Sequence, residues 1–240
     1  MKLLHIHEQL IGVKQYHKLN WEELKSMLLT KGIRFISSGC FGEVFDSPKW
    51  DYVVKVFEND DAYLSFVDYV LKHPSPCFPK FKKQVLKIHQ FHTRPSNAPK
   101  FLYAVRIEKL DKIDINNVPN DLYELLNWDI IKLFYACKYS EDTIIGELSL
   151  LQLFNKYEKF ELRALIETLV EFYSINTNFG IDLHIDNLML RGTKLVCIDP
   201  LIDNRHMMDN SNQDTFGLFR SKCSNQSDVD ISGPIYDALI

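Results

Sequence analysis

Asp182-Leu183-His184-Ile185-Asp186-Asn187 is the stretch that decides the fold of this 240-residue chain, together with Asp199 twelve residues after Asn187. An Asp can orient an attacking hydroxyl group and accept its proton, while an amide oxygen and a second carboxylate can hold Mg²⁺ against nucleotide phosphates. A single Asp or Asn in a loop is more often explained by turn chemistry. Three such residues at this spacing indicate a phosphoryl-transfer site, with Asp182 as the base and Asn187 and Asp199 as magnesium ligands.

The flanking residues predict a scaffold for this stretch. Apolar residues recur at helical spacing between residues 161 and 175, which predicts an amphipathic helix before the loop. After the loop, residues 188–190 and 194–198 predict two short strands around the turn Arg191-Gly192. Asp199 then emerges at the end of the second strand. Further helices are expected at residues 21–31, 61–71, 121–138 and 143–154.

A second pattern is Ile36-Ser37-Ser38-Gly39-Cys40-Phe41-Gly42-Glu43-Val44. Its glycines let the backbone approach phosphates closely, although a lone Gly-x-x-Gly is also a common hairpin turn. The next predicted strand, residues 51–57, carries Lys55 between valines. Lys55 is either a surface lysine on an edge strand or a largely buried cation that needs an anionic partner. The flanking valines favour the second interpretation, with a phosphate as the partner.

Taken together, these patterns resemble the protein-kinase-like superfamily over residues 35–203. Within it, the chain is most similar to the small early serine/threonine kinases of short-tailed lytic bacteriophages. The Asp-x-His-x-x-Asn loop (Asp182, His184, Asn187) and the Asp199-Pro200 pair also occur in aminoglycoside and choline phosphotransferases. They therefore specify the superfamily better than the substrate.

The resemblance implies an α+β, bilobal protein-kinase-like fold in a single domain over residues 1–240. Residues 1–108 would form an antiparallel-sheet N-lobe with an N-terminal helix, residues 109–203 a reduced, mainly helical C-lobe, and residues 204–240 a polar tail. The implied cofactors are ATP and Mg²⁺. Asp182 and His184 are the implied catalytic residues, and His184 either donates a hydrogen bond to the transferred phosphate or is a structural loop histidine. The implied nucleotide-binding residues are Ser37, Gly39, Phe41, Gly42, Val44, Val53, Lys55, Ile107, Glu108 and Leu110.

The chain departs from the family pattern at regulatory positions. The predicted helix over residues 61–71 has no Glu to pair with Lys55, so Asp68 is the candidate partner and Asp61 the second choice. Gly180 and Ile181 occupy the two positions before Asp182 at which protein kinases have His and Arg. Pro200 stands where they carry an aromatic residue. The resemblance therefore implies a compact phosphotransferase that lacks the usual regulatory groups.

Three functions follow from these patterns. The favoured one is an ATP-dependent serine/threonine protein kinase that modifies host proteins and itself. The second is a small-molecule phosphotransferase of aminoglycoside or choline type; against it, only about 37 residues follow Asp203 to build an acceptor pocket. The third is a pseudokinase or inhibitory binding module, which the missing regulatory Glu suggests and the retained Lys55, Asp182 and Asn187 oppose.

Composition restricts the class of protein and its cellular compartment. A hydrophobic content of 46% is enough for a sizeable core, and a net charge of −4 argues against a dedicated nucleic-acid binder. Five cysteines without paired metal spacing indicate reduced thiols. No segment has the pattern of an export signal or a membrane span. We therefore expect a cytoplasmic protein, in the host cytoplasm if a phage encodes it, without membrane partners.

Overall fold

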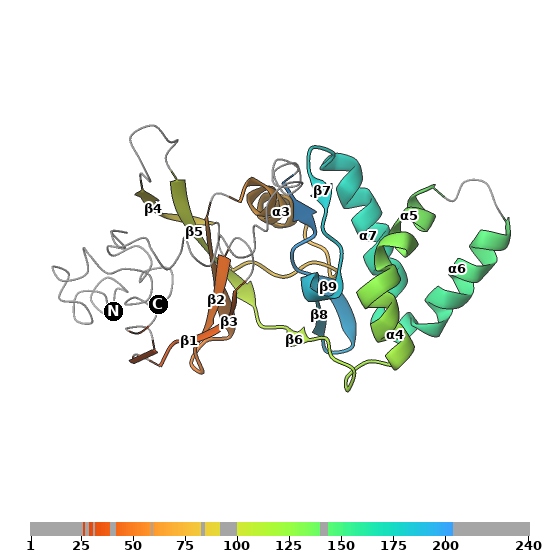
Figure 1. Ribbon diagram of the computed structural model, residues 1–240, viewed down its shortest axis with the longest axis horizontal. Coiled ribbons are helices and arrows are strands. Elements are labelled where there is room, and N and C mark those ends of the chain that lie inside the picture. Colours follow the sequence, from red (N-terminus) through yellow and green to blue (C-terminus); the bar gives the residue numbers. More distant parts are fainter. Residues whose placement is uncertain are drawn as a thin grey trace, which may run out of the picture. The chain divides into compact units, whose positions relative to one another are not determined.

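The computed structural model describes residues 26, 29–30, 32–38, 42–58, 60–82, 85–91, 100–139 and 144–203, and its helices and strands are drawn in Figure 1. The described residues divide into two compact units. One contains the residues up to 60 together with 81–108, and the other contains 61–80 and the residues from 109 onward. The predicted tail over residues 204–240 and most of the predicted helix over residues 21–31 lie outside the described residues.

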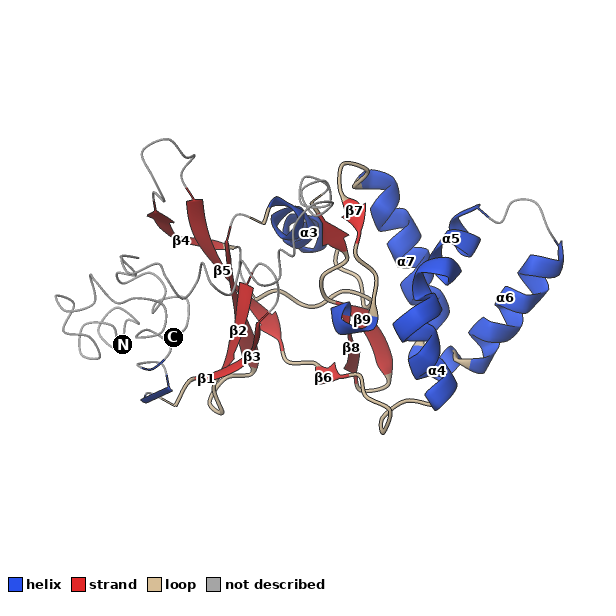
Figure 2. Cartoon of the chain, viewed as in Figure 1, coloured by secondary structure: helices blue, strands red, loops and turns tan. Residues whose placement is uncertain are grey.

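The first unit is built on an antiparallel sheet of five strands, in the order β1-β2-β3-β5-β4 (Figure 2). The strands are β1 (Arg34–Ser38), β2 (Gly42–Asp46), β3 (Tyr52–Glu58), β4 (Leu86–Phe91) and β5 (Lys100–Glu108). β3 is the middle strand, and its Val54 and Val56 are buried. The predicted strand around Lys55 is therefore a central strand, and the edge-strand alternative for Lys55 is wrong.

The second unit is mainly helical and contains two small sheets. Its helical elements are α3 (Asp61–Lys72), α4 (Asn120–Glu124), the π-helical η1 (Leu125–Asp129), α5 (Ile130–Tyr139), α6 (Ile144–Lys156), η2 (Glu158–Phe160), α7 (Leu162–Ile175) and η3 (Ile185–Asn187). Its strands are β6 (Asp111–Lys112), β7 (Gly180–Ile181), β8 (Leu188–Arg191), β9 (Lys194–Cys197) and β10 (Leu201–Ile202). β8 pairs with β6 and β9, and β7 pairs with β10.

Helix α7 forms the core of this unit. The predicted apolar stripe is buried as expected, from Leu162 to Tyr173. Near its end, Phe172 meets three aromatic rings from outside α7: Phe78 at a centroid distance of 5.4 Å, Phe66 at 5.8 Å and Tyr69 at 4.8 Å. Aromatic residues bury large areas and prefer such edge-to-face contacts, so this cluster fixes the end of α7 that precedes the predicted catalytic loop.

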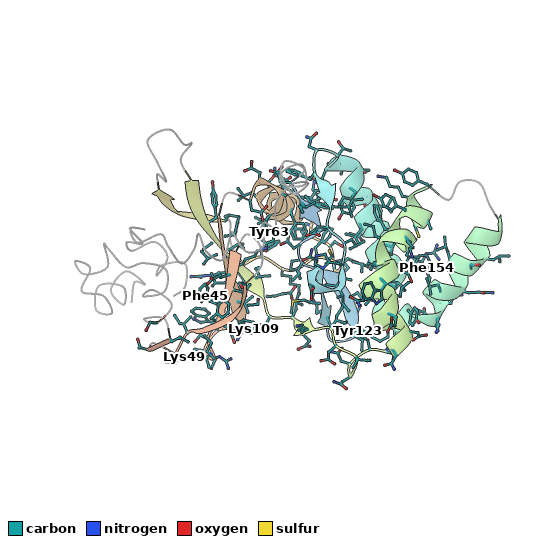
Figure 3. All side chains as sticks on the ribbon, in the orientation of Figure 1. Phe45, Lys49, Tyr63, Lys109, Tyr123 and Phe154 are labelled. Carbon is teal, nitrogen blue, oxygen red and sulfur yellow. The ribbon has the colours of Figure 1, made fainter. Side chains whose placement is uncertain are left out.

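Helix α3 differs from the prediction in one respect. Residues 61–80 were expected in the N-lobe, but they belong to the second compact unit. The reason is packing, because Phe66 of α3 contacts Phe172 and the hydroxyl of Ser65 donates to Asn176 Oδ1 at 3.2 Å. α3 also packs on β10. Two of the buried residues are labelled in Figure 3, Tyr63 on α3 and Phe45 on β2.

The predicted helix over residues 121–138 is interrupted. Residues 125–129 adopt π-helical geometry between α4 and α5, which inserts extra chain into the turn while Leu122, Leu126 and Ile130 stay buried. No described helix combines the length and the hydropathy needed to cross a membrane. The antiparallel sheet of the first unit and the mainly helical second unit confirm the predicted α+β fold class.

Replacing Phe172 by Ala tests the importance of the aromatic cluster. Removing a fully buried ring leaves a cavity, so Phe172→Ala should lower the free energy of unfolding by about 3–5 kcal/mol. Urea denaturation followed by circular dichroism measures the change. Trp128→Ala is the control, because this side chain is 69% exposed and its loss should cost less than about 1 kcal/mol. Equal losses for both variants would contradict the assignment of the core.

Candidate active site

The catalytic loop begins where β7 pairs with β10. Ile181 lies opposite Leu201, and the backbone N–H of Asp182 donates to the carbonyl oxygen of Pro200 at 2.9 Å. The backbone of the predicted base is thereby fixed to the residue that follows the predicted metal ligand Asp199. Two residues that are eighteen positions apart in sequence meet at this hydrogen bond.

The side-chain amide of Asn187 lies against Asp182. Its Nδ2 donates to the backbone oxygen of Asp182 at 2.8 Å and to the Asp182 carboxylate oxygen Oδ2 at 3.0 Å. An amide carries two hydrogens on nitrogen and its acceptor capacity on oxygen. Because Nδ2 faces Asp182, Oδ1 of Asn187 is the atom left to act as a ligand.

Backbone hydrogen bonds close these residues into a ring. The N–H of Ile198 donates to the carbonyl oxygen of Asn187 at 2.8 Å, directly before Asp199. Directly after it, Pro200 accepts the bond from Asp182. Asp199 is therefore held on both sides, and Asp182, Asn187 and Asp199 belong to one hydrogen-bonded ring within the second unit. We refer to this set of bonds as the loop ring.

His184 lies beside the base. Its Nε2 is 3.3 Å from Asp182 Oδ1 and 3.0 Å from Asn187 Nδ2. Both hydrogens of the Asn187 amide are directed to Asp182, so Nε2 of His184 is assigned as a donor and not as an acceptor from that amide. It then donates a hydrogen bond to the Asp182 carboxylate. The hydrogen bond to Asp182 raises the pKa of His184, burial partly offsets the rise, and the charges of Asp182, Asp186 and Asp199 add to it. The predicted contact of His184 with a phosphate stays a prediction.

The residues fit a magnesium ion that keeps most of its water. Among the described residues, no three His, Cys, Asp or Glu side chains form a metal-binding cluster. Mg²⁺ typically takes only one or two protein ligands besides phosphate and water oxygens. The amide oxygen of Asn187 and the half-buried carboxylate of Asp199 are two oxygen ligands of this kind. Three carboxylates contribute to the raised pKa of His184, so the local field favours a cation.

The first unit gathers the predicted nucleotide-binding residues on one face of its sheet. Ser37 lies opposite Val44, Val44 opposite Lys55, and Lys55 opposite Val105. Directly opposed residues in antiparallel strands share a face, as do alternate residues along a strand. Val53 and its partner Ile107 form the next row on the same face. Ser37, Val44, Val53, Lys55 and Ile107 therefore lie together, as the resemblance implies.

Gly42 has a structural reason to be glycine. A Cβ atom at this position would lie 2.5 Å from the backbone oxygen of Val56 and 2.8 Å from the Cβ of Phe57. Both distances are too short for any other residue. The close approach of β2 and β3 thus explains Gly42 without any phosphate. Gly39 and Phe41, the other predicted residues of this loop, lie outside the described residues.

The remaining predicted residues are placed as follows. Glu108 ends β5, and Leu110 lies in the short connection before β6. Asp68, the candidate partner of Lys55, is 62% exposed on α3, and its carboxylate accepts a bond from Lys72 Nζ at 2.6 Å. The structure thus gives Asp68 a local partner, and its pairing with Lys55 stays a prediction.

Sequence reasoning missed one residue of the site. Tyr173 was counted only as part of the apolar stripe of α7, yet its hydroxyl donates to the carbonyl oxygen of Pro200. A polar atom on an otherwise apolar helix face is the signal that could have identified it, since a buried Tyr hydroxyl needs a hydrogen-bond partner.

Comparison with protein-family models and with curated proteins gives no match. Among solved structures, the chain is similar to spectinomycin phosphotransferase, APH(9)-Ia, in complex with ADP and spectinomycin. The identity is 14% over 87% of this chain and 80% of that chain, with a TM-score of 0.27.

The geometry of His184 can be tested by NMR. Asp182→Asn removes the group that contributes most to the raised pKa of His184 and leaves the burial that opposes it. The imidazole pKa should therefore fall, relative to the wild-type protein, in a titration with EDTA present. Asp186→Asn is the matched control and should lower the pKa less, because Asp186 Oδ2 is 3.9 Å from His184 Nδ1 and exposed. An unchanged pKa in Asp182→Asn would show that His184 and Asp182 are not bonded.

Proposed function

We propose that this protein is a magnesium- and ATP-dependent phosphotransferase that delivers the γ-phosphoryl group to a hydroxyl acceptor. The observation that supports this proposal most is the loop ring, which holds a carboxylate, an amide and a second carboxylate together in one unit. A binding module has no physical need for a positioned base beside two magnesium ligands. The pseudokinase alternative is therefore less well supported.

Asp182 is the proposed base. Its carboxylate is 35% exposed, and each oxygen accepts a hydrogen bond, Oδ1 from His184 and Oδ2 from Asn187. These bonds fix the orientation of the carboxylate. Each carboxylate oxygen keeps a second lone-pair direction for an acceptor hydroxyl. In phosphoryl transfer such positioning contributes more than proton abstraction itself.

Asn187 and Asp199 are the proposed magnesium ligands. When bound, Mg²⁺ neutralises charge that develops on the transferred phosphoryl group. The chain contributes the ligand geometry, because hydrogen bonds hold both neighbours of Asp199. Ile198 is bonded to the carbonyl oxygen of Asn187, and Pro200 is bonded to the N–H of Asp182. For the nucleotide itself, we propose the sheet face that carries Val44, Lys55 and Ile107, with Lys55 as the phosphate-binding cation.

Two classes of acceptor are open to this chemistry. Serine or threonine residues of host proteins are our first proposal, which rests on the resemblance to small phage kinases and places the enzyme in the host cytoplasm. A small-molecule hydroxyl is the second. It is favoured by the Asp-x-His-x-x-Asn loop and by Asp199-Pro200, both of which also occur in aminoglycoside and choline phosphotransferases.

Asp182→Asn tests the proposed reaction. The variant should lose at least about 100-fold in phosphoryl transfer from labelled ATP while it still binds Mg-ATP, because only the base is removed. Asp186→Asn is the matched control in the same loop, and its exposed side chain should leave activity within about threefold. Full activity in Asp182→Asn would remove Asp182 from the role of base.

The acceptor class is decided by one assay with three sets of acceptors: a bacterial lysate, aminoglycosides including spectinomycin, and choline. Label on lysate proteins or on the protein itself supports the kinase proposal. Label only on a small molecule supports the second proposal. Binding of ATP without transfer to any acceptor would support the third hypothesis, a pseudokinase or inhibitory binding module.

A further inference from the structure

We propose that Tyr173 of α7 is a positioning residue for the catalytic loop, acting through the carbonyl group of Pro200. The proposal rests on the proposed phosphotransferase function and adds a residue outside the predicted site. Tyr173 is nine residues before Asp182 and is buried in the helical core. Its hydroxyl is nevertheless bonded to the backbone that joins the base and the metal ligand.

The Pro200 carbonyl is the junction of this arrangement. It accepts one hydrogen bond from the Asp182 N–H at 2.9 Å and a second from the Tyr173 hydroxyl. A carbonyl oxygen has two lone pairs, so these two donors satisfy it fully. The residue that carries this oxygen follows directly on Asp199. A donor from the rigid helix thus fixes the point where the base and the metal ligand are connected.

Tyr173 is suited to act as a permanent donor. Burial raises the pKa of its phenol well above the ordinary value, and the charges of Asp182 and Asp199 raise it further, so the hydroxyl keeps its proton. The ring is held by edge-to-face contacts with Phe134 at 5.0 Å and Phe172 at 5.4 Å between centroids. A donor fixed in this way costs little rearrangement when substrates bind.

The strand pairing that precedes the loop is short. β7 consists only of Gly180 and Ile181, and neither has a side-chain hydrogen-bond donor. β10 is equally short, so two residue pairs join these strands. The hydrogen bond from Tyr173 ties Pro200 to α7, whose inward face is buried from Leu162 to Tyr173.

Tyr173→Phe tests the proposal, because it removes the hydroxyl and keeps the ring. We expect kcat for phosphoryl transfer to fall about 10- to 100-fold, the usual range for residues that orient ligands of a metal site, with KM for ATP within about threefold. The thermal midpoint should fall by no more than about 5 °C. Tyr157→Phe is the matched control: Tyr157 is also a buried tyrosine of this unit, and its hydroxyl bonds Asp121 instead. This variant should keep wild-type kcat.

A donor at the same place should restore activity. A protein with 4-aminophenylalanine at position 173 has an N–H group near the lost hydroxyl and should recover most of kcat. A purely structural role of Tyr173 would predict instead that kcat follows thermal stability across the three variants. Wild-type kcat in Tyr173→Phe would overturn the proposal.

Hydrogen–deuterium exchange gives a readout that needs no activity. In Tyr173→Phe, amides in segments 180–187 and 198–202 should exchange faster than in the wild type, while the rest of α7 is unchanged. Tyr157→Phe should show no change in these segments. Exchange that is identical in wild type and Tyr173→Phe would overturn the proposal. A wild-type protein that phosphorylates no acceptor would instead refute the proposed function, and the exchange result would still decide whether Tyr173 holds the loop.

Discussion

The hydrogen bond from the Asp182 N–H to the Pro200 carbonyl is the constraint on which the rest of the site depends. It joins the loop that carries the base to the segment that carries the second carboxylate. Pro200 has no N–H group of its own, so it contributes to this junction only as an acceptor. The bonds from Asn187 to Asp182 and from Ile198 to Asn187 then complete the loop ring.

Placing several acids in one small region carries an electrostatic cost. Asp182, Asp186 and Asp199 all act on His184 in the same direction and favour its protonated form. Like charges at close range destabilise each other unless a cation or hydrogen-bond donors compensate. Here His184 and Asn187 supply donors to Asp182, and a magnesium ion would supply the remaining compensation. A field of this sign favours a bound divalent cation.

The sequence predicted the second unit well where local signals are strong. The helix before the loop, the hairpin after it and the position of Asp199 all follow from periodicity and turn residues between 161 and 199. These features depend on short-range patterns, which a single sequence carries.

Long-range packing was not predictable in the same way. α3 lies in the second compact unit, and nothing in its own sequence shows that Phe66 meets Phe172, more than a hundred residues away. The bond from Tyr173 to Pro200 was missed for the same reason. The π-helical segment at residues 125–129 has no local residue signature that we can identify. Gly42 was singled out as a nucleotide-binding residue, whereas the steric reason for its glycine lies in the adjacent strand β3.

The central claim is that Asn187 and Asp199 hold one divalent cation beside Asp182. A crystal structure of the protein with Mn²⁺ and a non-hydrolysable ATP analogue tests it most directly, because the anomalous signal locates the ion. The claim predicts a single ion bound through Asn187 Oδ1 and the Asp199 carboxylate, at about 2.0–2.3 Å from each. An ion bound elsewhere, or analogue bound with Asn187 and Asp199 both free of metal, would contradict it.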